Sequence, residues 1–484
     1  MTEKQKQNIK NILIIKLSSI GDCLLATPAI ESIRRAYPES FITWLIEDKS
    51  KDIALLNPNI NKVIVIDKKN YRLKDYLKLI ATLKSDKYDM SVDLQGVDRT
   101  SLFAFLSGAK ERYVEEYANL GFLSNKKINR KGRKPEHAAK FYLYLAASSG
   151  GAVLDSIKPI FKTNKADEEF ANKFISDKFG SPNNTIKNTI FVGINPGGAW
   201  ATKKWPIEYF AKLSELILEK YDARIVIFGG KEDEISAKNI ISILRSNFDF
   251  AGASAAARAA ANATAADTAY NLIADATGQT TLMQAKELIA KMDYFITGDS
   301  GLMHIAASIE NGPEIISLFG PTSSELTGPI GKDNIKILRS GLICSPCFKK
   351  SCILADKKAD KKIDKKGMDS VQTTAEYAAD INNINADANA FVSSDADGTD
   401  GIDDADDNNN GDNNDCNNGS DNMNYGKNIN NINKVFDSGI NNLNLNIKSN
   451  VNLETYALCM KKICVSDVFK LISDKQDKQK GNVR

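Results

Sequence analysis

The sequence predicts an α/β protein of two doubly wound domains that face each other across a cleft, with a long low-complexity insertion near the C-terminus. Short apolar, β-branched runs alternate with amphipathic helical runs, which is typical of parallel sheets covered by helices on both faces. The alternation occurs twice along the chain. Without two segments that are poor in large apolar residues, the 484-residue chain has the length of two domains.

The first half begins with NILIIKL (residues 11–17), an apolar run of the parallel-strand type, which is followed by the tight turn SSIGD. A helix is predicted after this turn, over residues 24–37, and a second one over 75–85. Further strands are predicted at 41–47, 63–67 and 88–94.

The second half repeats this order after a linker near residues 150–167. Its predicted strands are 189–195, 223–230, 293–297 and 314–320. Its predicted helices are 207–220, 232–244, 281–291 and 302–309.

Two segments interrupt the pattern. Residues 251–268, AGASAAARAAANATAADT, are rich in Ala and have almost nothing large to bury, so we expect a surface insertion. Residues 356–449 are dense in Asn, Asp, Gly and Ser, a composition typical of disorder. The predicted domains are therefore 1–155 and 166–345, with residues 450–484 packing back on them.

The composition excludes several classes of protein. The chain has 64 Lys and Arg against 61 Asp and Glu, a balance that argues against general nucleic-acid binding. No apolar run is long enough to span a bilayer. The polar start, MTEKQKQNIKN, argues against a secretory signal, so we expect an intracellular enzyme.

The first candidate for a binding or catalytic turn is Ser18-Ser19-Ile20-Gly21-Asp22, between a predicted strand and helix. Gly21 permits a tight backbone path, and N–H groups at a helix start favour an anion. Asp22 either caps the helix or acts as a general base aimed into the cleft. The chain has neither GxGxxG nor GxxxxGK[ST], which disfavours a nicotinamide site and a P-loop.

The second turn is NPGGAWATKKWP (residues 195–206). Its glycines, the Thr202 hydroxyl and two lysines at a helix entrance suit a diphosphate, whereas the alternative is a basic loop with a packed Trp. Pro206 is expected at the first helical position.

The third turn, TGDSGLMH (residues 297–304), also joins a strand to a helix. Asp299 or Ser300 can cap that helix. His304 is one of only two His in the chain, and it has either a structural role or a ligand-binding one. The fourth turn, FGPT (319–322), is either part of the same site or an ordinary Gly-Pro turn.

Six of the seven cysteines lie at or beyond residue 344. Cys344, Cys347, Cys352 and Cys459 have the spacing of a Cys₄ zinc site. A structural metal, a pair of disulfides and unbridged thiols remain open alternatives.

Four motifs together resemble glycosyltransferase family 9, the lipopolysaccharide heptosyltransferases. They are IKLSSIGDCLLATPAI, NPGGAWATKKWP, TGDSGLMHIAA and SLFGPTS, and they occur in this order outside the two insertions. The resemblance implies the GT-B fold, two Rossmann-like domains with the site between them. It also implies inverting transfer of L-glycero-D-manno-heptose from ADP-heptose to the inner core of lipopolysaccharide, at Kdo or the first heptose.

The resemblance assigns roles to residues. Asp22 is the implied general base, and Ser19, Gly21 and Gln95 lie on the acceptor side, in the domain 1–155. The donor domain 166–345 supplies Glu232 for the ribose hydroxyls, with Asp233 as a close rival. The implied contacts of the donor phosphates and sugar are Thr202, Lys203, Asp299, Ser300, Gly301 and His304.

The same resemblance implies the partners. They are ADP-heptose, a lipid A–Kdo type acceptor and the cytoplasmic face of the inner membrane of a Gram-negative bacterium. The enzyme is then cytoplasmic and peripheral to that membrane, and catalysis needs no metal or other cofactor. A family 9 transferase for another nucleotide sugar and a non-catalytic nucleotide-binding protein are the alternatives.

Overall fold

The computed structural model describes residues 7–68, 70–180, 189–247, 272–331, 333–352 and 457–481, all of which belong to one compact unit. Both predicted insertions, 251–268 and 356–449, lie outside the described residues.

The first sheet has six strands, all parallel, in the order β3-β2-β1-β4-β5-β6. Its central strand β1 is fully buried from Ile12 to Ile15, as its apolar run predicted. The strands are β1 (Asn11–Ile15), β2 (Phe41–Glu47), β3 (Lys62–Ile66), β4 (Met90–Asp93), β5 (Glu111–Glu115) and β6 (Lys126–Ile128).

The second sheet repeats this topology in the order β12-β11-β10-β7-β8-β9, again all parallel. Read from the other edge, the two strand orders correspond, and each has the Rossmann arrangement. The strands are β7 (Ile190–Asn195), β8 (Ala223–Ile227), β9 (Ile273–Asp275), β10 (Tyr294–Gly298), β11 (Glu314–Phe319) and β12 (Ile335–Arg339).

Helices follow most strands, as right-handed crossovers between parallel strands require. In the first half they are α2 (Ile20–Leu25), α3 (Thr27–Ala36), α4 (Asp52–Leu55), α5 (Leu73–Ser85), α6 (Asp98–Leu106) and α7 (Ala138–Ser148). In the second half they are α8 (Lys165–Phe179), α9 (Ile207–Lys220), α10 (Glu234–Asn247), α13 (Leu282–Ile289), α14 (Gly301–Ser308) and α15 (Ser324–Thr327).

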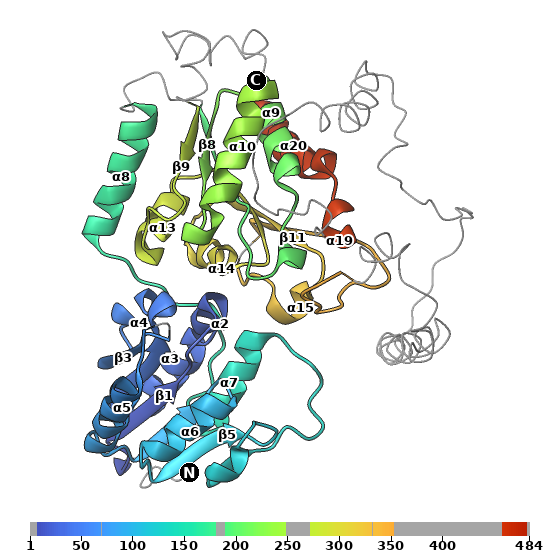
Figure 1. Ribbon diagram of the computed structural model, residues 1–484. Helices are drawn as coiled ribbons and strands as arrows, with labels where there is room; N and C mark the ends of the chain where they lie inside the picture. Colours follow the sequence, from blue (N-terminus) through green and yellow to red (C-terminus); the bar gives the residue numbers. More distant parts are fainter. Residues whose placement is uncertain are drawn as a thin grey trace. The chain divides into compact units, whose positions relative to one another are not determined.

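The described C-terminal residues complete the second half. They form α19 (Leu458–Lys461) and α20 (Val465–Gly481), and α20 lies along α9 (Figure 1). The indole Nε1 of the buried Trp205 donates to the carbonyl of Ile463 at 3.0 Å. None of the helices in the described ranges is both long and apolar enough to cross a membrane.

Several element boundaries differ from the sequence prediction. The single helix expected over 24–37 is two helices, because α2 already begins at Ile20 and α3 starts anew with Pro28 in its first turn. Pro206 precedes α9 as its N-cap instead of occupying its first position. Helix α8 begins at Lys165, inside the expected linker.

The strand order locates the candidate site. In a doubly wound sheet, ligands bind where the order reverses, beyond the carboxyl ends of the two strands on either side. This point lies between β1 and β4 in the first sheet and between β7 and β10 in the second. The turns carrying Asp22, Gln95, Gly197 and Asp299 follow these four strands.

Candidate active site

The first turn caps α2 with its own side chains. Ser19 is the N-cap, and its hydroxyl donates to Oδ2 of Asp22 at 2.8 Å while its backbone N–H donates to the same oxygen at 3.3 Å. Asp22 is therefore not the N-cap, as one interpretation of the sequence held, but takes part in capping from the third helical position. Because each carboxylate oxygen accepts more than one hydrogen bond, this contact leaves Asp22 able to meet a substrate hydroxyl.

The other oxygen of Asp22 meets two residues that the sequence did not single out. The Tyr142 hydroxyl donates to Oδ1 at 2.9 Å, and the Lys16 ammonium donates to the Tyr142 hydroxyl oxygen, also at 2.9 Å. Burial alone would raise the pKa of Asp22, but the Lys16 charge and the hydrogen bonds from Ser19 and Tyr142 hold that pKa below its ordinary value. The carboxylate is thus ionised at neutral pH.

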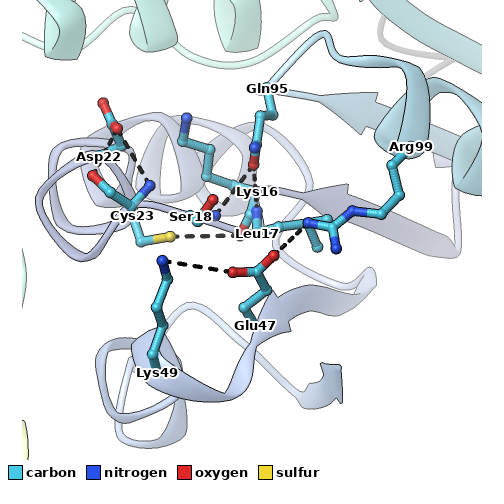
Figure 2. Close-up of polar contacts among 10 residues, drawn as sticks. Lys16, Leu17, Ser18, Asp22, Cys23, Glu47, Lys49, Gln95 and Arg99 are labelled. Carbon is cyan, nitrogen blue, oxygen red and sulfur yellow. Dashed lines mark hydrogen bonds and ion pairs between the residues drawn. The ribbon is translucent and has the colours of Figure 1, made fainter. Parts of the chain in front are cut away.

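Gln95 orders the backbone of the first turn. Its side-chain oxygen accepts from the N–H groups of Leu17 at 2.7 Å and Ser18 at 3.2 Å (Figure 2). The backbone N–H of Gln95 itself donates to buried Asp93 at 2.9 Å. The predicted acceptor-side residue therefore holds the Asp22 turn against β4.

A buried carboxylate lies near these turns. Glu47, at the end of β2, is only 4% exposed and lies between Arg99 and Lys49, both of which form ion pairs with it (Figure 2). The two cations compensate the cost of burying this charge.

The second and third turns are tied together by Asn195, another residue that the sequence analysis did not assign. Its amide nitrogen donates to the hydroxyls of Thr297 and Ser300, each at 2.9 Å, and its oxygen accepts from the N–H of Gly197 at 3.1 Å. Ser300 in turn caps α14 by accepting from the N–H of Met303. These hydrogen bonds join the turn after β7 to the turn after β10.

Two lysines of the second turn form separate ion pairs. Lys203 meets Asp299 at 2.7 Å, with both side chains mostly buried, and its ammonium lies 4.5 Å from the centre of the Trp200 ring. Lys204 meets buried Asp233 at 3.1 Å. Of the two, Lys203 therefore lies beside the third turn, where the sequence analysis expected the donor phosphates.

The remaining donor-side candidates differ in what they already contact. The Thr202 hydroxyl donates to the carbonyl of Lys349 at 2.8 Å, so it links the turn to the segment after β12. Asp233 accepts from the N–H of Gly230 and pairs with Lys204, whereas Glu232 is exposed. Of these two acidic residues, Glu232 is thus the more accessible to a ligand.

His304 lies in the first turn of α14 and contacts the first turn of α2. It is 5% exposed, and its Nδ1 has no hydrogen-bond partner within the described structure. Burial lowers its pKa to about 4, against the opposing charges of Asp299 and Asp22, so the imidazole is neutral at pH 7. Helices α2 and α14 pack together here, with Gly301 against Ile20.

The structure thus brings Gly21, Asp22, Gly301 and His304 to one place, with Lys203 and Asp299 forming an ion pair at the next turn. Glu232 follows β8, and its neighbour Asp233 lies against Gly197 of the second turn. Of the residues that sequence reasoning missed, Lys16 had one available signal, since it is a lysine in an otherwise apolar strand run. Asn195 opens the second turn, NPGG, which the sequence analysis had singled out, whereas Tyr142 had no such signal.

The fourth turn is joined to the cysteine-bearing segment after β12, where the N–H of Phe348 donates to the carbonyl of Pro321 at 2.7 Å. A methyl group on Gly320 would lie 2.8 Å from Sγ of Cys459 and 2.5 Å from Sδ of Met460, so this turn packs against the C-terminal segment. Cys344, Cys347, Cys352 and Cys459 are free thiols. Among the described residues, no three His, Cys, Asp or Glu side chains are arranged to hold a metal ion, and zinc binding stays a prediction.

Solved structures show the same fold. A glycosyltransferase family 9 protein from Veillonella parvula matches with a TM-score of 0.55 at 24% identity, over 74% of this chain and 90% of that one. The ADP-heptose LPS heptosyltransferase II of Escherichia coli also matches with a TM-score of 0.55, at 20% identity, over 69% of this chain and 92% of that one. Two Rossmann-like domains of this kind form the GT-B fold.

The sequence comparisons make the family specific. Residues 76–358, more than half of the chain, match the model of glycosyltransferase family 9 (heptosyltransferase), and the chain belongs to this family. Lipooligosaccharide heptosyltransferase 2 of Haemophilus ducreyi is 27% identical over 69% of this chain and 90% of its own length. Lipopolysaccharide heptosyltransferase 2 of E. coli K12 is 25% identical over 66% of this chain and 85% of its own length.

Proposed function

We propose that this enzyme transfers L-glycero-D-manno-heptose from ADP-heptose to the inner core of lipopolysaccharide, at Kdo or the first heptose, and inverts the anomeric centre. One observation carries the proposal: the ionised Asp22 lies where α2 meets His304 of the donor-side turn. The names of the relatives, which are heptosyltransferases of lipopolysaccharide or lipooligosaccharide, support the choice of sugar and acceptor.

The proposed reaction is a single displacement. Asp22 takes the proton of the acceptor hydroxyl while the acceptor oxygen forms a bond to the anomeric carbon. The bond from that carbon to the diphosphate oxygen breaks with its electron pair, and ADP leaves. Attack on the face opposite the leaving group inverts the anomeric centre.

The donor side stabilises the charge that develops on the leaving diphosphate. Lys203 supplies the positive charge, and its ion-pair partner Asp299 directly precedes Ser300, the N-cap of α14, whose N–H groups add to that charge in this proposal. In this proposal Thr202, Asp299, Ser300, Gly301 and His304 contact the donor phosphates and sugar, and Glu232 binds the ribose hydroxyls. Ser19, Gly21 and Gln95 contact the acceptor.

The proposed setting follows from the substrates. A lipid A–Kdo acceptor is anchored in a membrane, so the enzyme acts in the cytoplasm at the face of the inner membrane. The Lys203 ammonium and the helix N-terminus supply the positive charge that a metal ion provides in other transferases. Catalysis by this enzyme then requires no metal.

The test is transfer from ADP-heptose to an isolated lipid A–Kdo acceptor, with ADP release as the readout and NMR of the product anomeric centre. Release that needs both substrates, with an inverted product, is the expected result. Asp22→Asn is expected to lower kcat by about 10²- to 10⁴-fold, while calorimetry still detects ADP-heptose binding. Asp86→Asn is the matched control, because Asp86 pairs with Lys62 away from this turn.

Other outcomes would redirect the proposal. Binding of ADP-heptose without transfer to this acceptor or a one-heptose acceptor would overturn the acceptor assignment. Transfer from a different nucleotide sugar would overturn the heptose assignment but keep the family. Full activity of Asp22→Asn would exclude Asp22 as the base.

A further inference from the structure

We propose that Tyr142 and Lys16 are positioning residues for the Asp22 carboxylate: the Tyr142 hydroxyl, fixed by the Lys16 ammonium, holds Oδ1 of Asp22 so that the free lone pair of this oxygen faces the acceptor hydroxyl. This inference rests on the proposed function, in which Asp22 is the base. It adds two residues that neither the motifs nor the comparisons assign.

The three side chains come from separate parts of the first half. Lys16 follows β1, Asp22 lies in α2, and Tyr142 lies in α7, 120 residues further along the chain than Asp22. The hydrogen bonds run in one direction, from the Lys16 ammonium to the Tyr142 oxygen and from the Tyr142 hydroxyl to Asp22 Oδ1, each at 2.9 Å. A phenol that accepts from an ammonium has its proton left for the carboxylate.

Burial protects these two hydrogen bonds from competition by water. Lys16 is 4% exposed and Tyr142 is 7% exposed, so water does not compete freely for either group. A lysine buried to this degree needs a compensating partner. Among the described residues, the Lys16 ammonium donates its hydrogen bond to the Tyr142 hydroxyl. The ammonium is also 4.4 Å from the Tyr142 ring centre.

The protonation states agree with this direction. Burial, followed by the charge of Asp22, raises the pKa of Tyr142 well above its ordinary value, so the phenol keeps its proton and donates it. The pKa of Asp22 is lowered even though it is partly buried, because the Lys16 charge and two side-chain donors oppose the effect of burial. The lysine charge thus acts on the carboxylate across the phenol.

The remaining contacts of Asp22 define what is left for a substrate. Ser19 donates to Oδ2 from both its hydroxyl and its backbone N–H, and Tyr142 occupies one lone pair of Oδ1. His304 faces the same carboxylate from α14 and is neutral, so it does not replace Lys16 as a counter-charge. The carboxylate is therefore held at both oxygens, and the second lone pair of Oδ1 stays available.

The first test is Tyr142→Phe, which removes the hydroxyl and keeps the ring. We expect kcat to fall by about tenfold to a hundredfold, with KM for ADP-heptose changed by less than about twofold. We also expect the acidic limb of the kcat–pH profile to move to higher pH, because Asp22 loses a hydrogen bond that favours its charged form. A merely structural role would not move this limb.

Tyr88→Phe is the matched control. Tyr88 is also a buried tyrosine of the first half, and its hydroxyl donates to Asp86 at 2.7 Å. The same atom and the same kind of hydrogen bond are therefore removed away from the site. We expect this variant to keep the wild-type kcat and pH profile, whatever its melting temperature.

Lys16 supplies an independent test that keeps the phenol. Lys16→Met removes the charge at similar side-chain length, and we expect the same fall in kcat and the same direction of the pH shift. Lys16→Arg keeps a charged donor and should recover most of the activity. If Tyr142→Phe fails to fold, the two Lys16 variants decide the question.

The outcomes separate this inference from the proposed function. Wild-type kcat and pH profile in folded Tyr142→Phe or Lys16→Met, together with inactive Asp22→Asn, would overturn the positioning role alone. An active Asp22→Asn variant would overturn the base assignment on which it rests. A rise in KM for ADP-heptose with kcat unchanged would assign Tyr142 to donor binding instead.

Discussion

The backbone of Gly21 lies against the imidazole of His304, so that a methyl group at Gly21 would be 2.5 Å from Cδ2 and 3.1 Å from Nε2 of the ring. Gly21 directly precedes Asp22, the proposed base, in α2, and His304 lies in the first turn of α14. At this point, space is available only for a hydrogen atom.

Gly21→Ala is therefore expected to displace either the imidazole or the first turn of α2. We expect kcat/KM to fall by at least about tenfold and the free energy of unfolding to fall by about 1–3 kcal/mol. Steady-state kinetics and urea unfolding measure the two effects. Gly121→Ala is the control, since no atom there lies within 3.8 Å of the added methyl group, and equal behaviour of the two variants would contradict the argument.

Lys203 and Lys204 provide a matched pair for the donor site. Lys203→Met removes the charge beside Asp299 and should raise KM for ADP-heptose by about tenfold or more, as expected for a lost charge-assisted contact to phosphate. Lys204→Met breaks the pair with Asp233 and should affect stability more than KM. Isothermal titration with ADP separates the two, and tighter or unchanged binding by Lys203→Met would exclude its phosphate role.

His304 makes the folded protein sensitive to acid. Its pKa is about 4 in the folded state and 6.5 in the unfolded chain, so between these values the unfolded state binds more protons. Stability is therefore fully present above about pH 6.5 and is lost as the pH falls towards 4, by up to about 3 kcal/mol from this group. Urea unfolding at about pH 7.5 and 4.5 should show a smaller loss in His304→Asn than in the wild type, and an equal loss would refute the assignment.

Metal removal tests the expected absence of a catalytic cofactor. Because Lys203 and the start of α14 provide the positive charge at the proposed diphosphate site, transfer should continue at an unchanged rate in excess EDTA. A loss of activity that Mg²⁺ or Mn²⁺ restores would show that a metal is needed. Zinc analysis of the same preparation tests the hypothesis for the four cysteines, and a clearly substoichiometric content would reject it.

Local sequence patterns predicted the central strands of the fold. Apolar runs such as residues 11–17 identified the central strands, because a strand buried on both faces needs apolar side chains throughout. The short edge strands β6 and β9 have three residues each and carry too little periodicity to detect. The break between α2 and α3 lies at Ala26, just before Pro28, and helical periodicity alone does not reveal it, although a proline is favoured in the first turn of a helix and not in its interior.

Part of the candidate site could likewise be predicted from the sequence, and part could not. Turns after buried strands could be found from sequence because glycines and polar residues follow apolar runs, and these turns include those of Asp22 and Asp299. The contacts of Asp22 with Tyr142 and of Asn195 with Thr297 join residues more than 100 positions apart. Such pairs depend on the strand order of each sheet, and a single sequence does not specify that order.

The C-terminal helices have a consequence for how this chain can vary. The donor half is composed of two stretches of chain, ending at residue 352 and resuming at 457 in the described structure, and Trp205 and α9 hold the second stretch by packing. Since Trp205, α9 and α20 pack together, a substitution in the C-terminal helices acts on the same hydrophobic core as a substitution in the sheet more than 100 residues earlier in the chain.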